Sequence, residues 1–368
     1  MALEFIDSCG MMGAYSSDSA QAPPTYRKYT LGQNCYGGAA QSFQIRRSGS
    51  FSLRLEGGSA YKTLQYKDTR IVGCACYIPN HGSTGSHGGI IGFSSGGTAL
   101  ATLYLEPDNS LTILSEPNGV VVFNSGSVPY YLTIGQYHYF EISCALSGAT
   151  PITGTFTLKI DGNTIASAVS NSLGINASSL LSGAATMNEF GLILNSLATP
   201  TYYQDIYVLN SDTTDINGHT TTLDTFLGDV EIDAIFPDAD ASPNDFTQGA
   251  GGFTYNYQFV AGNPATDDSS YLYDDTVTDG EDYNMTPITG FTGTLLGAQL
   301  CVYARKDAEG SRAFEALLNA TPIANLFGTN QYLYDWYDYF LYPLDSDNGT
   351  AWTPALFNAA DFGVEITV

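Results

Sequence analysis

Gly135-Gln-Tyr-His-Tyr-Phe-Glu-Ile-Ser-Cys144, Gly154-Thr-Phe-Thr-Leu-Lys-Ile160 and Thr164-Ile-Ala-Ser-Ala168 are the three runs of this chain that determine its fold. Apolar and polar side chains alternate within the runs, which predicts β-strands. Between the second and third runs stands Asp161-Gly162-Asn163, and Asp-Gly supplies the positive φ angles of a tight hairpin. The unit therefore predicts consecutive antiparallel strands.

Runs of the same kind occur on both sides of this unit, separated by clusters of Gly, Ser, Asn and Asp. Their short length and frequent turns predict one β-sandwich over residues 1–210. Residues 211–227 are polar with little periodicity, which indicates a linker. The predicted strands on the two sides of the unit span residues 42–47, 52–55, 70–77, 90–93, 101–105, 111–115, 120–124, 188–194 and 202–210.

After the linker the pattern resumes and predicts a second, acidic β-sandwich over residues 228–368. Residues 299–314 have the form of a β-hairpin, because alternating residues flank the polar tip Asp307-Ala-Glu-Gly310. The predicted fold class is all-β, with two jelly-roll-like β-sandwich domains in tandem. Strands of the second domain are expected at residues 229–237, 295–303, 312–318, 332–342 and 362–368.

The composition favours the same fold class. A chain of 368 residues is long enough for two domains, each with its own core. It contains 26 Tyr and 19 Phe, whereas only 13% of its residues are charged. Abundant aromatic residues and few Lys, Glu and Arg are typical of β-proteins with many turns.

The charge is strongly negative and unevenly distributed. The net charge of −25 divides into −6 for residues 1–225 (9 basic, 15 acidic) and −19 for residues 226–368 (3 basic, 22 acidic). Such a surface repels nucleic acid, so DNA and RNA are not expected partners. We expect neither a signal peptide nor a membrane span, because the N-terminus lacks a basic segment before an apolar run and no apolar stretch approaches the roughly 20 residues of a span.

Residues 1–210 resemble the concanavalin A-like, or laminin-G-like, jelly roll. The resemblance rests on Tyr137-His-Tyr-Phe-Glu-Ile142, Phe156-Thr-Leu-Lys-Ile-Asp-Gly-Asn163 and Tyr203-Gln-Asp-Ile-Tyr-Val-Leu209. That fold hosts lectins, glycosidases and structural modules, so it implies an architecture and no particular activity.

The second half resembles the C-terminal region of tailed-phage virion proteins. Three blocks carry the resemblance: Phe226-Leu-Gly-Asp-Val-Glu-Ile-Asp-Ala-Ile-Phe-Pro237, the stretch 299–312, and Thr350-Ala-Trp-Thr-Pro-Ala-Leu-Phe-Asn-Ala-Ala-Asp-Phe-Gly-Val364. It implies a structural protein of the virion, in the tail, a fibre or the head surface, and no enzymatic activity. The implied partners are other virion proteins and further copies of the chain, with a trimer as one candidate.

Asp229, Glu231 and Asp233 alternate and would share one face of a predicted strand. Retaining glycosidases need two carboxyl groups about 5–5.5 Å apart, a separation that residues i and i+2 of a strand can approach. The triplet lies outside the concanavalin-like region, so we favour a solvated face over a catalytic or cation site.

Two acidic clusters could bind Ca²⁺ through loop oxygens. We expect any such site at Asp238, Asp240 and Asp245 rather than in the cluster at residues 267–282; flexible acidic loops are the alternative for both. No other metal or cofactor is expected, because the six cysteines lack zinc spacing and are expected to be buried thiols. His138 lies in a predicted strand and is expected to be structural, and His219 in the linker is expected to be solvated. His81 and His87, six residues apart on one loop, are weak evidence for a metal.

Aromatic residues supply the candidate binding surfaces. Tyr130, Tyr131, Tyr202 and Tyr203 could stack on the sugar rings of a host glycan, which makes a carbohydrate-binding adhesin the alternative function. Core or interface packing is the competing interpretation. The candidate residues for a protein interface are Tyr332, Tyr334, Trp336, Tyr337, Tyr339 and Trp352.

Overall fold

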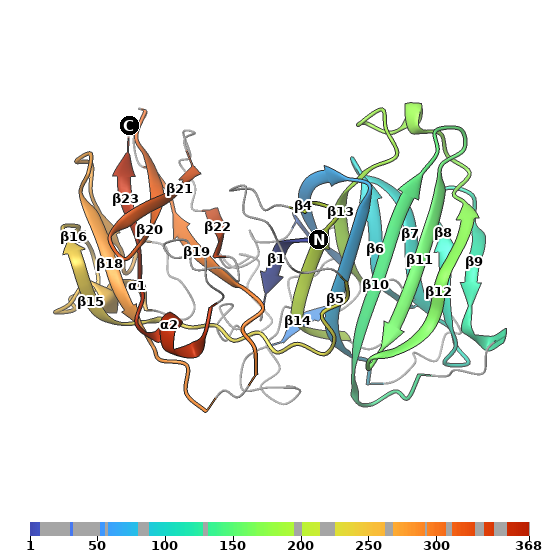
Figure 1. The fold of residues 1–368 in the computed structure, drawn as a ribbon, viewed down its shortest axis with the longest axis horizontal. Helices are drawn as coiled ribbons and strands as arrows, with labels where there is room; N and C mark the ends of the chain where they lie inside the picture. The colour runs from blue at the N-terminus through green and yellow to red at the C-terminus, as the bar shows by residue number, and fades with distance from the viewer. Residues whose placement is uncertain are drawn as a thin grey trace.

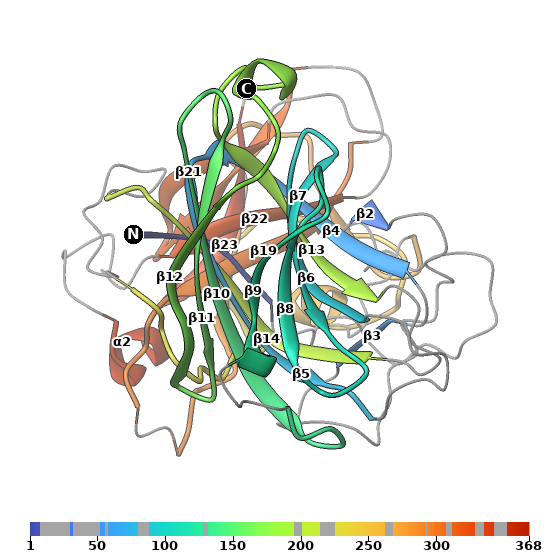
Figure 2. The same cartoon turned by 90° about the vertical axis from the view of Figure 1, so that its right-hand side faces the viewer.

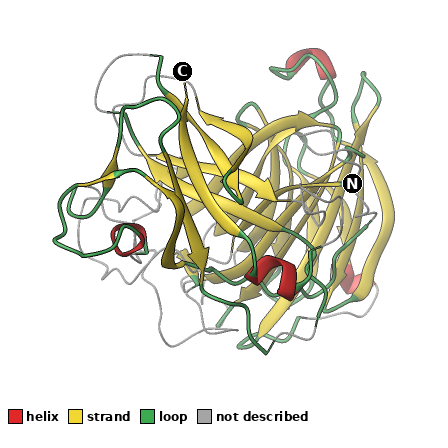
Figure 3. Cartoon of the chain, turned by 60° about the vertical axis from the view of Figure 1, so that its left-hand side comes forward, coloured by secondary structure: helices red, strands yellow, loops and turns green. Residues whose placement is uncertain are grey.

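The computed structural model describes thirteen segments of the chain. Almost all of their regular structure is β-strand (Figure 3), so the predicted all-β fold class is confirmed. Strands before residue 211 form one body, and strands after residue 236 form a second body beside it (Figure 1). The described residues are 1–7, 30–31, 52–55, 58–79, 88–127, 132–194, 201–213, 225–261, 268–290, 293–306, 311–327, 335–341 and 352–367.

The first body is a sandwich of two seven-stranded antiparallel sheets. Side chains from the inner faces of both sheets, such as Val72, Phe140 and Phe93, form a single core. Figure 2 separates the two layers, with β10, β11 and β12 in one and β6, β7 and β8 in the other. The first sheet has the order β1 (Ala2–Asp7), β14 (Thr201–Asn210), β5 (Thr69–Tyr77), β10 (Tyr137–Ser147), β11 (Thr153–Ile160) and β12 (Asn163–Ser172), with β3 (Leu53–Leu55) also on β14. The second has the order β2 (Thr30–Leu31), β4 (Gly58–Lys67), β13 (Met187–Leu194), β6 (Gly88–Ser95), β7 (Thr98–Leu105), β8 (Leu111–Ser115) and β9 (Val120–Asn124), and short 3₁₀ turns occupy Ser125–Ser127 and Ala177–Ser179.

The hairpin between β11 and β12 forms where the sequence predicts it. Asp161 and Gly162 have φ angles of 50° and 77°, the left-handed values that Asp-Gly favours. The Asp161 carboxylate accepts the backbone N–H of Tyr139 at 2.8 Å and contacts His138 Nδ1 at 2.6 Å. The turn is thereby fixed to the neighbouring strand β10.

The second body is built on a five-stranded antiparallel sheet. Its core contains Trp352, Phe357 and Phe362, which pack ring against ring. Helix α2 (Pro354–Asn358) begins with Thr353 Oγ1 accepting the N–H of Leu356, the usual arrangement of an N-cap. The sheet order is β15 (Pro237–Asn244), β18 (Gly280–Met285), β23 (Asp361–Thr367), β20 (Ala313–Leu318) and β21 (Thr321–Phe327); two pairs stand apart, β16 (Thr247–Gln248) with β17 (Leu272–Tyr273) and β19 (Ala298–Ala304) with β22 (Asp335–Leu341), and α1 covers Tyr257–Val260.

The predicted hairpin over residues 299–314 is wrong. Strand β19 pairs with β22 and not with β20, which instead lies between β23 and β21. Strand β20 is buried along most of its length. As a central strand it pairs on both sides, so neither of its edges is exposed to water. Alternation identified both strands, but it does not determine which strands pair.

The strand predicted over residues 229–237 is also wrong. Residues 225–236 are extended but join no sheet, and β15 begins only at Pro237. Strand β15 was missed because Pro237, Pro243 and its Asp residues are typical of a loop. It lies at the edge of its sheet, the place where strands tolerate proline. Within the described residues, no helix is long and apolar enough to cross a membrane.

Candidate functional site

The stretch 225–236, here called the tether, connects the two bodies. Phe226, Leu227 and Val230 pack against the core of the sandwich, whereas Ile235 packs against the core of the second body. The Lys159 ammonium lies 4.6 Å from the centre of the Phe226 ring, a cation–π contact. The tether therefore packs against both bodies.

Buried acceptors on the sandwich receive the backbone N–H groups of the tether. Glu141 Oε1 accepts the N–H of Gly228 at 2.7 Å, and Tyr207 Oη accepts the N–H of Leu227 at 3.1 Å. Asp205 Oδ1 accepts the N–H of Ile232 at 3.0 Å. Since the tether belongs to no sheet, these side chains satisfy donors that would otherwise lack partners.

Local irregularities place these acceptors. Strand β14 shifts register against β5 between Gln204 and Tyr207, and Asp205 has a φ angle of 50°. A bulge of this kind redirects a side chain. Burial, and then the Glu141 carboxylate, raise the pKa of Tyr207 well above its usual range. The hydroxyl therefore stays protonated and donates to Glu141.

Strand β1 makes a second connection between the bodies. Gln299 Oε1 on β19 accepts the N–H of Ile6 at 3.1 Å, and Gln299 Nε2 contacts Cys301 Sγ at 2.9 Å. A methyl group added to Gly297 would lie 2.8 Å from Leu3, so the backbone before β19 approaches β1 closely. The pair β19–β22 is thus held beside the first sheet (Figure 1).

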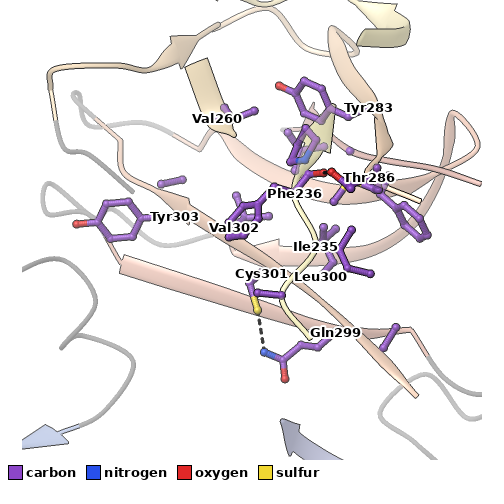
Figure 4. A pocket seen from close by; sticks show the side chains of 18 of the residues that line it. Ile235, Phe236, Val260, Tyr283, Thr286, Gln299, Leu300, Cys301, Val302 and Tyr303 are labelled. Atoms are coloured by element: carbon purple, nitrogen blue, oxygen red, sulfur yellow. Dashed lines mark hydrogen bonds between the residues drawn. The ribbon is translucent and has the colours of Figure 1, made fainter. Parts of the chain in front are cut away.

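A cavity of about 1950 Å³ lies between the tether, β19 and the five-stranded sheet. Figure 4 shows Ile235 and Phe236 of the tether near Leu300 and Val302 of β19. Thr286 Oγ1 fixes the tether there by donating to Phe236 O at 3.0 Å. The volume exceeds the roughly 300–1,000 Å³ of most small-molecule pockets.

The carboxylates Asp229, Glu231 and Asp233 are all exposed on the tether and line the cavity rim. They alternate with the half-buried Val230 and Ile232, so the predicted common face exists although the predicted strand does not. They present negative charge to solvent, as the solvated-face interpretation expects.

Two acidic residues that sequence analysis did not single out are buried in adjacent positions of β18. Burial raises the pKa of Glu281 to about 7 although Phe246 N–H and Asn256 Nδ2 donate to it. Burial likewise raises the pKa of Asp282 to about 6. One oxygen of each lacks a hydrogen-bond partner within the described part of the chain.

The residues predicted to bind calcium have other partners. The Asp240 carboxylate accepts the N–H groups of Asn256 and Tyr257 at 3.2 and 2.5 Å. Asp245 Oδ2 accepts the N–H of Gly280 at 3.2 Å, and Asp238 is exposed. No group of three or more His, Cys, Asp or Glu in the described segments could hold a metal ion. Calcium binding stays a prediction without a geometric site.

The predicted glycan residues on β14 are buried. Tyr202 and Tyr203 are 7% and 0% exposed, and the Tyr203 hydroxyl donates to Ile90 O. They cannot stack on a sugar at the surface, so that prediction is corrected. Tyr130 and Tyr131 lie outside the described residues.

One predicted interface residue, Trp352, belongs to the core of the second body and is 4% exposed. We therefore reassign it from interface to core. Trp336, Tyr337 and Tyr339 lie on β22, where the structure describes the backbone only. Tyr332 and Tyr334 lie outside the described residues.

The predicted role of the thiols and of one histidine agrees with the structure. Cys74, Cys76 and Cys144 are buried and free, and burial raises their pKa values, whereas Cys301 is only half-buried and departs from the prediction. His138 is buried against Asp161 and the carbonyl of Thr133. His81, His87, His219, Cys9 and Cys35 lie outside the described residues.

Sequence analysis missed a group of exposed aromatic residues around α1 and β17. Tyr255 is 56% exposed, Tyr273 53% and Phe253 45%. The alternation Phe253-Thr-Tyr255-Asn-Tyr257 after the glycine-rich stretch 249–252 is the sequence signal that could have revealed the first part of this group.

Comparisons with known proteins give no family. No family model matches the chain, and no curated protein matches it. Among solved structures, an alginate lyase from Aplysia kurodai is similar at a TM-score of 0.39 and 11% identity, over 57% of this chain and 100% of that one. The cellulose-induced protein Cip1 gives 0.36 and 15% over 51% and 89%. An endo-β-1,4-glucuronan lyase from Trichoderma reesei gives 0.35 and 10% over 58% and 97%. Likeness this low says nothing about activity.

Proposed function

We propose that this chain is a structural, non-enzymatic component of a tailed-phage particle, acting through protein–protein binding as a homo-oligomer. The resemblance of its second half to virion proteins suggests the particle. The single observation that carries the binding role is the pair β19–β22 beside a partly apolar cavity of about 1950 Å³.

A two-stranded ribbon is marginally stable in water. All seven residues of β19 are only half-buried, and the strand lies next to a volume that the described part of the chain does not fill. Apolar surface of this kind is usually covered by a partner.

We propose a second copy of the same chain as the occupant. Strand β19 contains no charged residue, although residues 226–368 carry a net charge of −19 (3 basic, 22 acidic). A contact confined to β19 therefore places no like charges of that strand opposite each other, although the exposed Asp229, Glu231 and Asp233 line the adjacent cavity. Closed, symmetric homo-oligomers are also the commonest assemblies.

The two alternative functions have less support. An adhesin acting through Tyr202 and Tyr203 would need surface residues, and both are buried. A glycosidase using Asp229, Glu231 and Asp233 would need a pair of carboxyls fixed at the separation that the chemistry requires. These three residues are exposed on a segment outside any sheet.

Light scattering coupled to size-exclusion chromatography tests the assembly. We expect an oligomer for the full chain and a monomer for Val302→Glu, because a buried carboxylate at a contact is costly. Leu181→Glu is the control, since Leu181 is 80% exposed on the sandwich. Circular dichroism confirms that each variant is folded. A monomeric parent at all concentrations, or a Val302→Glu variant that assembles like the parent, would contradict the proposal.

Quantitative mass spectrometry of purified particles tests the location. On the order of hundreds of copies would indicate a head-surface or tail-tube protein, and about a dozen or fewer a fibre or baseplate protein. If the chain were absent from purified particles, the virion proposal would be wrong. Any self-assembly of the chain would then need another explanation.

A further inference from the structure

The aromatic loop, residues 249–257, projects from the edge of the second body that carries β15 and β16 (Figure 1). Its Tyr255 is 56% exposed, more than any other aromatic residue whose side chain the structure describes. The Tyr255 and Tyr257 rings lie 6.1 Å apart with an interplanar angle of 23°. The exposed ring of Tyr255 therefore lies beside the half-buried ring of Tyr257.

The backbone beneath these rings is held by side chains. Gln258 Oε1 accepts the N–H groups of Thr254 and Tyr255 at 3.0 and 3.1 Å. Asp240 accepts the next two N–H groups, those of Asn256 and Tyr257. Four consecutive N–H groups are thus fixed by two side chains, so the rings are presented on an ordered loop.

Asn256, between the two tyrosines, is buried and anchors the loop from below. Its Nδ2 donates to Asn244 Oδ1 at 2.6 Å, to Phe246 O at 3.0 Å and to Glu281 Oε2 at 3.1 Å. Its Oδ1 accepts from Gln248 Nε2 at 2.9 Å. The polar groups of this side chain are satisfied, while the neighbouring Tyr255 is exposed and Tyr257 is half-buried.

We propose that Tyr255 and Tyr257 form a preorganised binding site for a neutral glycan. Aromatic faces bind the apolar C–H faces of sugars, and a loop that is already ordered loses little entropy on binding. The glycan-binding residues would then lie on the second body rather than on the concanavalin-like first body. The inference does not depend on the virion proposal.

The acidic surroundings favour a neutral glycan over an anionic one. Residues 226–368 hold three basic residues, and each is engaged: Arg305 with Asp268 at 2.6 Å, Lys306 with the Arg312 carbonyl, and Arg312 with the Asp275 carbonyl. A sugar acid or a nucleic acid would find no uncommitted cation there, only surrounding carboxylates. A neutral sugar avoids that repulsion.

The surroundings of the rings favour a sugar over a protein. Most exposed residues next to the pair are small or polar, namely Ala250, Gly251, Gly252 and Thr254, and Phe253 is the exposed apolar side chain among them. A stable protein interface buries about 800 Å² per partner around an apolar centre. Two tyrosine rings and one phenylalanine ring with mostly small and polar neighbours suit a few sugar units, whose hydroxyls need hydrogen-bond partners.

Binding of oligosaccharides to the full chain tests the proposal. The probes are neutral gluco-, xylo- and chito-oligosaccharides on an array, with oligogalacturonides as the anionic comparison, followed by calorimetry on each positive probe. We expect saturable binding to a neutral class and none to oligogalacturonides. Tyr255→Ala should raise Kd about tenfold, whereas Tyr255→Phe should change it by less than about threefold because the ring is retained.

Tyr66→Ala is the matched control, because Tyr66 is an exposed tyrosine on β4 of the sandwich. It should bind like the parent, and circular dichroism should be unchanged in all three variants. Failure of every neutral probe to bind the parent, or parental affinity in Tyr255→Ala, would overturn the proposal. A protein ligand that is lost in Tyr255→Ala without any glycan binding would replace it with a protein contact. Assembly through β19 should be the same in Tyr255→Ala, so the two proposals can fail separately.

Discussion

The hydroxyl of Tyr207 on β14 donates to the carboxylate of Glu141 on β10, and both groups also bind the tether. The pair lies on the face of the first sheet that the tether covers. It therefore connects the internal packing of the sandwich to the position of the second body.

Tyr207→Phe should destabilise the sandwich and loosen the tether. The change removes one donor and one acceptor, and it leaves Glu141 and the N–H of Leu227 each with one partner fewer. An unsatisfied buried polar group costs about 1–3 kcal/mol. Urea denaturation should detect a loss of that size, together with faster proteolysis near residue 227. Tyr66→Phe, at an exposed tyrosine, should leave both measurements unchanged. If Tyr207→Phe were as stable as Tyr66→Phe, the Tyr207–Glu141 pair would not connect the sandwich to the tether.

Trp352→Ala should lower the stability of the second body by about 3–5 kcal/mol, the usual cost of deleting a large core aromatic. Trp352→Phe should cost much less, because the indole N–H has no partner in the described structure and the ring contacts with Phe357 and Phe362 can persist. Thermal unfolding in dilute solution is the measurement. If Trp352→Ala altered oligomer size but not the stability of the monomer, Trp352 would be an interface residue after all.

Glu281 and Asp282 should make the second body less stable as the pH rises. Their folded pKa values, about 7 and about 6, lie above the unfolded values of 4.5 and 3.8. Between these limits the folded state binds more protons than the unfolded state, so stability falls with increasing pH. The decline should begin near pH 4 and level off above about pH 7.

The comparison of Glu281→Gln with the parent isolates this effect from the general repulsion among the acidic residues. The variant should lose less stability than the parent between pH 5 and pH 8, as measured by thermal unfolding at both values. Asp238→Asn, at an exposed carboxylate on β15, is the control and should follow the parent. Parallel pH profiles for Glu281→Gln and the parent would show that Glu281 does not titrate in this range.

Local signals were sufficient for most strands of the sandwich, but β1, β2 and β4 were not predicted, and the predicted strand 42–47 lies outside the described residues. Asp161-Gly162 determines a hairpin within a few residues, so β11 and β12 could be predicted from the sequence alone. The pairing of β19 depends on β22, whose residue Leu341 lies opposite Ala298. No nearby residue encodes that choice, and the hairpin predicted in its place was wrong.

The binding residues were harder to predict for a related reason. Alternation along β14 suggests one exposed face, but all ten of its residues are buried because the strand lies between β1 and β5 and is covered at Tyr207 by the tether. Tyr202 and Tyr203 are adjacent and point to opposite faces of β14, so the sequence offered at most one of them for the surface, and both are buried. Tyr255 was missed although the alternation from Phe253 to Tyr257 signals it, and that alternation does not encode the loop conformation that Asp240 and Gln258 hold.

Glu4 and Arg70 form a buried ion pair. The loss of stability should be large when only one partner is replaced and small when both are replaced. Arg70 is 0% exposed, and its Nη2 donates to Glu4 Oε1 at 2.9 Å. Glu4 falls where β1 shifts register against β14, and it also accepts the N–H of Gln65 at 3.1 Å.

Glu4→Leu would leave a guanidinium buried without its counter-ion, at a cost of about 3–5 kcal/mol. The double variant Glu4→Leu/Arg70→Met removes both charges and should recover most of that loss, because an apolar pair of similar size is often neutral in place of a buried ion pair. Urea denaturation of the parent, the two single variants and the double variant measures the coupling. Additive losses in the double variant would mean that the two side chains stabilise the sandwich independently.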